Sequence, residues 1–238
     1  MRTISNPFLG LSLFALWVGL LALFAFWPQW DLQISARFFD AQRCAQTMDK
    51  AGFCRGFALA QMPVLQNIRF FLLALPPWVG IAILIWLIAD WRIGLRWKDT
   101  GFRLKVALTA TLIIWPLLIV NGVLKAFWGR PRPWQSEPFG GISPFIEAGR
   151  ITDHCASNCS FVSGEAASAG WLALLVLLFP PTYRWPAVLI LIPASILMAS
   201  LRIAFGAHYA SDALLGYWGA IAVFALLFSI MTRLATKA

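Results

Sequence analysis

Three short polar segments interrupt a chain that is otherwise strongly apolar. The first segment runs from Lys125 to Pro133 and has the spacing K-x6-R-P. The second segment, 163–165, reads Ser-Gly-Glu, and the third has the spacing R-x5-H-x3-D and contains Arg202, His208 and Asp212. Fixed cations beside an imidazole with a carboxylate partner predict a site that binds an anion and attacks it with a ring nitrogen.

Lys125, Arg132 and Arg202 are the expected anion-binding residues. A phosphoryl group in transfer spreads negative charge over three oxygens, and fixed cations stabilise that charge. Arginine adds a bidentate fork and lysine a point charge. The alternative is that long basic side chains at helix ends only reach toward the membrane surface.

Ser163 and Gly164 precede a long apolar stretch that is expected to be helical. Free N–H groups at a helix start attract phosphate, and glycine allows the backbone to approach it closely. The alternative role for Ser163 is an ordinary N-cap. His208 and Asp212 are four residues apart and share one face if they lie on a helix, so that Asp212 can accept a hydrogen bond from one ring nitrogen and leave the other free.

The composition predicts an all-α membrane protein. Of the 238 residues, 60% are hydrophobic and only 12% are charged, whereas soluble domains have about 25% charged residues. We expect a single domain, 1–238, built as a six-helix transmembrane bundle, because a span needs roughly 20 apolar residues. The predicted spans are 8–30, 70–89, 106–124, 161–183, 185–201 and 213–232.

The net charge of +9 is better explained by membrane orientation than by nucleic-acid binding. Five basic residues lie in one short loop between the second and third spans, and such loops are typically cytoplasmic. This orientation places both termini in the cytoplasm and the three polar segments at the outer face. The five residues are Arg92, Arg96, Lys98, Arg103 and Lys105.

The four cysteines lie in the two predicted outer loops. Cys44 and Cys54 follow the first span, and Cys155 and Cys159 follow the third. An oxidising compartment favours disulfides, and we expect one pair within each loop, although four cysteines allow three connectivities. A zinc site is the competing interpretation, but it typically needs closer cysteine pairs or several histidines.

The three segments resemble the motifs of the type 2 phosphatidic acid phosphatase (PAP2) superfamily, which also includes vanadium haloperoxidases and glucose-6-phosphatase. The family pattern is K-x6-R-P, then P-S-G-H, then S-R-x5-H-x3-D. Segment 125–133 matches the first motif fully. Arg202, His208 and Asp212 match the third, although Leu201 stands in place of its leading serine.

The resemblance implies a mechanism without metal or cofactor. His208 would attack phosphorus and form a phosphohistidine, and Asp212 would orient the imidazole. Water would then release phosphate. The phosphate oxygens would be bound by Lys125, Arg132, Ser163, Gly164 and Arg202.

The second motif departs from the family, because Glu165 stands where the family has a histidine that protonates the leaving group. Glu165 can do so only when protonated. The alternatives are that His154 is the acid, that a diphosphate leaving group needs none, or that the protein is weakly active or inactive.

By resemblance, the substrate is a membrane lipid phosphate: phosphatidic acid, phosphatidylglycerol phosphate, undecaprenyl diphosphate or lipid A. The expected location is the bacterial inner membrane, with the active site facing the periplasm. Two rival functions stay open, a lipid phosphotransferase and a non-catalytic relative that binds or transports lipids. The sequence predicts no nucleic-acid partner and does not indicate an oligomeric state.

Overall fold

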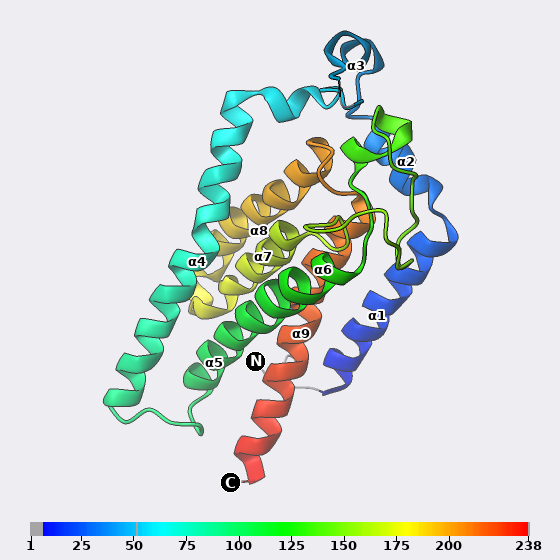
Figure 1. The fold of residues 1–238 in the computed structure, drawn as a ribbon. Coiled ribbons are helices and arrows are strands. Elements are labelled where there is room, and N and C mark those ends of the chain that lie inside the picture. The colour runs from blue at the N-terminus through cyan, green and yellow to red at the C-terminus, as the bar shows by residue number, and fades with distance from the viewer. Residues whose placement is uncertain (1–6, 51, 238) are drawn as a thin grey trace.

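The computed structural model describes residues 7–50 and 52–237, and within these ranges the chain forms helices and loops without β-strands (Figure 1). The longer helices are α1 (Pro7–Phe26), α4 (Pro63–Arg92), α5 (Thr100–Leu112), α7 (Gly164–Leu174), α8 (Pro181–Ala204) and α9 (Ala210–Lys237). The shorter ones are α2 (Gln29–Ala36), α3 (Ala41–Thr47), η1 (Ala58–Gln61), α6 (Lys125–Phe127), η3 (Pro133–Gln135), η4 (Glu137–Phe139) and η5 (Leu175–Leu178). A π-helical segment, η2 (Ile113–Leu124), connects α5 to α6.

Among the described residues, five helices are long and apolar enough to cross a membrane, and they contain five of the six predicted spans, apart from the end of the first. They are Phe8–Phe26, Pro63–Arg92, Thr100–Phe127, Pro181–Ala204 and Ala210–Thr236. The predicted fourth span, 161–183, is instead a shorter apolar helix, Gly164–Leu178. It begins where Ser163 caps it and ends before Pro180 and Pro181, because proline disfavours helical conformation in the residue before it.

The predicted first span, 8–30, is two helices. Pro28 lies between α1 and α2, where its ring prevents the continuous hydrogen-bond pattern of a single helix. The break places Asp31 in the first turn of α2, where it is fully buried. This turn is therefore part of the protein interior rather than the end of a lipid-facing span.

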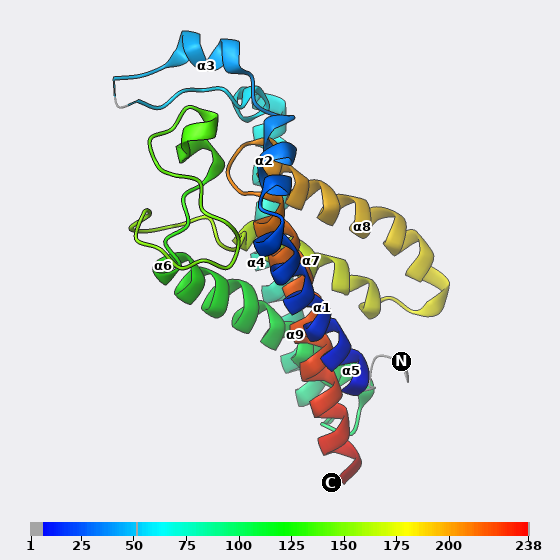
Figure 2. The same cartoon turned by 90° about the vertical axis from the view of Figure 1, so that its right-hand side faces the viewer.

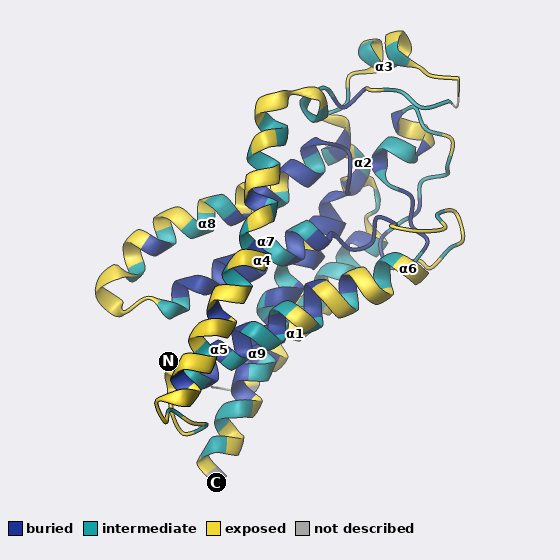
Figure 3. Ribbon diagram, turned by 60° about the vertical axis from the view of Figure 1, so that its left-hand side comes forward, coloured by how far each residue is buried: buried dark blue, intermediate teal, exposed yellow. Residues whose placement is uncertain are grey.

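Helix α9 is the centre of the bundle. It packs against α1, α5 and α7, and Trp171, Leu215 and Phe224 are among the fully buried side chains of this core. The outward faces of α1, α4 and α8 carry exposed apolar side chains (Figure 3), which is typical of surfaces that contact lipid.

The connections are gathered at two ends of the molecule. Helices α2 and α3 and the long connection between α6 and α7 lie toward one end (Figure 1), whereas the α4–α5 connection and the end of α9 lie toward the other. In the second view, the α7–α8 hairpin projects obliquely from the bundle (Figure 2). The cysteines pair within each loop as predicted, Cys44 with Cys54 and Cys155 with Cys159.

Candidate active site

The three polar segments meet at the end of the bundle that holds α2. Lys125 begins α6, Ser163 caps α7, and Arg202 lies in the last turn of α8. His208 lies in the short α8–α9 connection, and Asp212 is in the first turn of α9. The helix ends therefore bring together residues that are separated by up to 87 positions in the sequence.

His208 is buried and its ring is held in one orientation. Its side chain is 1% exposed, and Nδ1 lies 2.8 Å from the carbonyl oxygen of Ser160. A carbonyl oxygen can only accept a hydrogen bond, so Nδ1 carries the proton and Nε2 keeps its lone pair. This tautomer is the one required for attack by Nε2 on an electrophile.

Asp212 supports His208 through Ser160 rather than through the predicted direct hydrogen bond. The Asp212 Oδ2 atom lies 3.9 Å from His208 Nδ1, which is beyond hydrogen-bonding distance. Ser160 Oγ donates to Asp212 Oδ2 at 2.5 Å, and the same serine supplies the carbonyl that accepts from the ring. Ser160 is thus a positioning residue that the motif comparison missed.

Arg130 forms a buried ionic cluster with Asp31 and Asp212. The motif comparison did not indicate this cluster either. Its side chain is fully buried and donates to Asp212 Oδ1 at 2.7 Å and to Asp31 Oδ2 at 2.8 Å. It also donates to the hydroxyl of Ser211 at 2.9 Å. Burial alone would lower the pKa of Arg130, but the two carboxylates outweigh it and raise the pKa above its usual value. Arg130 is therefore charged and neutralised within the protein.

Three cations lie around His208, and within the described residues only Arg202 among them pairs with a carboxylate, that of Glu165. Burial lowers the pKa of His208 well below its usual value, and the charges of Arg202, Arg132 and Lys125 lower it further. Lys125 forms no ion pair among the described residues, and Arg132 contacts only neutral oxygens, those of Asn158, at 2.9 Å. Burial also lowers the pKa of Arg132, with a partial opposing effect of Asp212 and Glu165. The arrangement keeps the imidazole neutral and leaves positive charge available for an anion.

Ser163 and Gly164 begin α7 next to this group. The Ser163 hydroxyl accepts from the backbone N–H of Ala166 at 3.2 Å, so its N-cap role is realised. At Gly164 a Cβ atom would come within 2.6 Å of the side-chain oxygen of Asn121. Glycine is therefore needed there for the close contact between the start of α7 and the π-helical segment.

Glu165 is paired with two arginines. Its carboxylate accepts two hydrogen bonds from Arg69 of α4, at 2.6 and 3.0 Å, and lies 3.3 Å from Nε of Arg202. Arg69 is a third residue that the motifs did not indicate, since it lies 96 positions away. Proton donation by Glu165 would require the Arg69 pair to open.

The Cys155–Cys159 loop forms one wall of the site. The Cys159 N–H donates to the Lys125 carbonyl at 3.2 Å, and the Ser160 N–H donates to the Arg130 carbonyl at 2.8 Å. Asn158, inside the disulfide-closed loop, holds the Arg132 guanidinium. His154 lies exposed just outside the disulfide.

The helical bundle thus brings an imidazole with a free ring nitrogen close to the three cations of the sequence motifs. Residues 101–235 match the family model of the PAP2 superfamily, and the chain belongs to this superfamily. It is 42% identical over 221 residues to a lipid A 4'-phosphatase of Rhizobium leguminosarum, covering 92% of this chain and 94% of that one. It is 29% identical to a lipid A 4'-phosphatase of Francisella tularensis subsp. novicida, covering 82% and 86%.

The fold also resembles a solved structure. The crystal structure of a PAP2-type phosphatidylglycerolphosphate phosphatase from Bacillus subtilis superposes with a TM-score of 0.55 at 20% identity, and the match covers 96% of each chain. At this identity the likeness concerns the fold alone.

Proposed function

We propose that the protein is a membrane-embedded lipid-phosphate phosphatase that hydrolyses a phosphomonoester through a phosphohistidine. The observation that carries the proposal is the fixed tautomer of His208, whose Nε2 lone pair is free beside Lys125 and Arg132, two cations without a carboxylate partner among the described residues. A protein that only bound lipids would have no need for a neutral imidazole held by Ser160 and Asp212. The lipid-binding or transport function therefore ranks second.

In the proposed reaction, His208 Nε2 attacks phosphorus and a P–N bond forms while the bond to the leaving oxygen breaks. The leaving oxygen takes a proton, from Glu165 if that residue is the acid and otherwise from water, and departs as the lipid hydroxyl. Lys125, Arg132 and Arg202 stabilise the charge on the three equatorial oxygens, with Ser163 and the Gly164 N–H as further donors. The imidazole gains positive charge as it attacks, and Asp212 stabilises this charge through Ser160. Water then attacks phosphorus, the P–N bond breaks, and inorganic phosphate is released. Because the protein supplies the cations, the proposal needs no metal or cofactor.

The substrate we propose is the 4'-phosphate of lipid A. Support comes from the two relatives of that name in Rhizobium leguminosarum and Francisella tularensis subsp. novicida, and from a third in Rhizobium etli at 41% identity. Phosphatidic acid, phosphatidylglycerol phosphate and undecaprenyl diphosphate are the comparison substrates. A phosphotransferase would use the same phosphohistidine but pass the group to a second lipid instead of water.

We further propose six membrane spans, with the shorter helix α7–η5 as the fourth, and with both termini in the cytoplasm of a bacterial inner membrane. The basic α4–α5 connection and the end of α9 lie at the opposite end from the candidate site (Figure 1). The two disulfides lie at the end of the site. Both observations favour an active site that faces the periplasm.

The test is phosphate release by the detergent-purified protein in the presence of EDTA, measured with all four lipids. His208→Ala should reduce the rate at least 10³-fold, because no other group forms the covalent intermediate. Rapid quenching of the reaction should trap phosphate that is covalently bound to the wild-type protein, labile in acid and stable in base, and should trap none on His208→Ala. Transfer of labelled phosphate to a second lipid would indicate the phosphotransferase instead. The phosphatase proposal would be wrong if wild-type protein released no phosphate from any lipid.

Glu165 has two candidate roles, and one substitution separates them. As a general acid it must open its pair with Arg69, whereas as an acceptor it holds Arg69 and Arg202 near the phosphate. The bidentate pairing favours the second role. Glu165→Gln removes the acidic proton but keeps one acceptor oxygen, so a positioning role predicts a rise in KM with a small change in kcat. A selective fall in kcat for monoesters, but not for a diphosphate, would instead establish Glu165 as the acid.

A further inference from the structure

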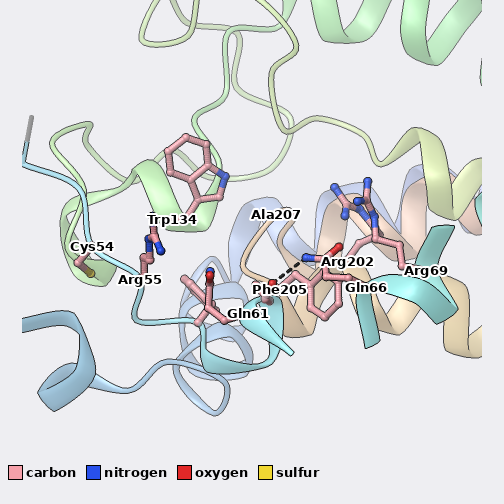
Figure 4. A pocket seen from close by; sticks show the side chains of 11 residues that line it. Cys54, Arg55, Gln61, Gln66, Arg69, Trp134, Arg202, Phe205 and Ala207 are labelled. Atoms are coloured by element: carbon pink, nitrogen blue, oxygen red, sulfur yellow. Dashed lines mark hydrogen bonds between the residues drawn. The ribbon is translucent and has the colours of Figure 1, made fainter. Parts of the chain in front are cut away.

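A polar and aromatic pocket lies directly beside the phosphate site, and the mechanism above does not use it. It has a volume of about 340 Å³, within the roughly 300–1,000 Å³ of small-molecule sites. Figure 4 shows Trp134 and Arg55 on one side, Arg202 and Arg69 on the other, and Gln61 and Gln66 between them. We refer to it as the headgroup pocket.

The headgroup pocket is joined to the phosphate site by the chain itself. Arg202 lines both, and Ala207, which lines the pocket, directly precedes His208. The backbone N–H of Trp134 donates to the carbonyl of Gly206 at 3.1 Å, and Trp134 follows the motif that contains Arg132. A group attached to a phosphate in the site would therefore lie close to the pocket.

The lining has the chemistry that binds a sugar ring. Trp134 offers the flat apolar surface that the C–H face of a pyranose contacts, and its ring is held edge-to-face by Phe53 at 5.6 Å. The carboxamide nitrogen of Gln66 donates to the Ala60 carbonyl at 2.7 Å, which holds this amide in place in the lining (Figure 4). The amide of Gln61 and the guanidinium of Arg55 add donors that suit hydroxyl and carbonyl groups.

We propose that the headgroup pocket is a saccharide subsite that binds the sugar carrying the phosphate ester. The inference rests on the proposed function and extends it to the residues that select a glycolipid over a glycerolipid. A glycerol phosphate headgroup has no ring to stack on Trp134, so it would leave the pocket filled with water. The pocket therefore contributes specificity rather than chemistry.

The experiment compares phosphate release from lipid A and from phosphatidic acid by Trp134→Ala, Trp134→Phe and Gln61→Ala. For lipid A we expect Trp134→Ala to raise KM about tenfold with little change in kcat, and Trp134→Phe to recover most of the loss. For phosphatidic acid the KM should change less than about twofold in all three variants. Trp185→Ala is the matched control, since Trp185 is 68% exposed at the start of α8.

A KM for lipid A that stays within twofold in folded Trp134→Ala and Gln61→Ala would overturn the subsite while leaving the phosphatase proposal intact. Wild-type protein that hydrolyses the glycerolipids but not lipid A would also overturn the subsite and leave the phosphatase proposal intact. If the wild type releases no phosphate from any lipid, the proposed function fails, and calorimetric titration of lipid A into His208→Ala decides the subsite. Binding of lipid A that weakens with Trp134→Ala in that background supports the subsite, and unchanged or absent binding overturns it.

Discussion

Arg130 and Arg132 are two residues apart in one polar segment, yet their surroundings are opposite. Arg130 is fully buried between two carboxylates, those of Asp31 and Asp212. Arg132 lies at the edge of the site, and its guanidinium is held by the neutral oxygens of Asn158. The first arginine is neutralised by the protein, whereas the second keeps a charge that only a ligand can neutralise.

The comparison shows how a buried cation can be assigned to structure or to function. A guanidinium with two carboxylates fixes the arrangement of α2 and α9 around it. A guanidinium positioned by carbonyl and amide oxygens is oriented without losing its attraction for anions. By this criterion Lys125 resembles Arg132 and is assigned to function, because Lys125 has no carboxylate partner among the described residues.

The largest expected effect is that of Arg130→Met. The substitution leaves Asp31 and Asp212 buried without their partner, at a cost of about 3–5 kcal/mol in the free energy of unfolding. Unfolding by denaturant in detergent measures it, with Arg132→Met as the matched control. Near-wild-type stability of Arg130→Met would remove the distinction between the two arginines.

Arg132→Met should have the opposite pattern. We expect a loss of about 10²-fold in phosphate release, since one donor to the transition state is removed. The free energy of unfolding should change by less than about 1 kcal/mol. Arg132→Lys should recover part of the activity, because the charge returns without the fork. Full activity in Arg132→Met would exclude Arg132 from the phosphate site.

The two disulfides offer a third test. Replacing Cys155 and Cys159 by serine should lower phosphate release about tenfold, because Asn158 then holds Arg132 less firmly and misplaced groups lose rate steeply. The same double replacement at Cys44 and Cys54 is the control. Because Cys54 lines the headgroup pocket, the rate is measured with phosphatidic acid, which does not need that pocket, and it should stay within about twofold, since the loop contacts η4 rather than the phosphate site. Equal losses in both pairs would show that the effect is one of general stability.

The smallest effect is a displaced titration of His208. The chain has only two histidines, so nitrogen NMR of His154→Gln reports His208 alone. Because the pKa of His208 is lower in the folded than in the unfolded protein, the folded state binds fewer protons than the unfolded state below about pH 6.5. The contribution of His208 to the free energy of unfolding should therefore be constant above that pH and fall as the pH decreases toward the pKa of His208 in the folded protein. A ring titration with a midpoint near 6.5 would contradict the cationic surroundings.

The spans and the motif residues could be predicted from the sequence because hydropathy and spacing are local signals. Segment 70–89 lies within α4 and segment 213–232 within α9, and the helix ends place Lys125, Arg202 and His208 in one region. Glu165 was singled out because it belongs to the second polar segment and because it departs from the family motif. Its contacts with Arg69 could not be predicted from that departure.

The missed residues act through long-range contacts that no local pattern contains. Asp31 and Arg130 are 99 positions apart, and Arg69 and Glu165 are 96 apart. Ser160 is an ordinary serine in an irregular loop. The one available signal was that Asp31 and Arg130 are opposite charges next to apolar spans, where an unpaired charge is costly. Helix α7 is short because Ser163 caps its start and because Pro180 and Pro181 follow the end of η5. The length of the apolar run did not indicate these two limits.

The ionic cluster around Arg130 also sets an order for the synthesis of the protein. Arg130 is made 99 residues after Asp31, but its second carboxylate, Asp212, follows 82 residues later. At about 5–20 residues per second, this interval lasts about 4–16 s. During that time Arg130 lacks its contacts with Asp212 and Ser211, and His208 lacks the support of Asp212. The site is thus completed only when α9 is in place, so a chain that stalls before α9 would lack the support of the nucleophile that we propose.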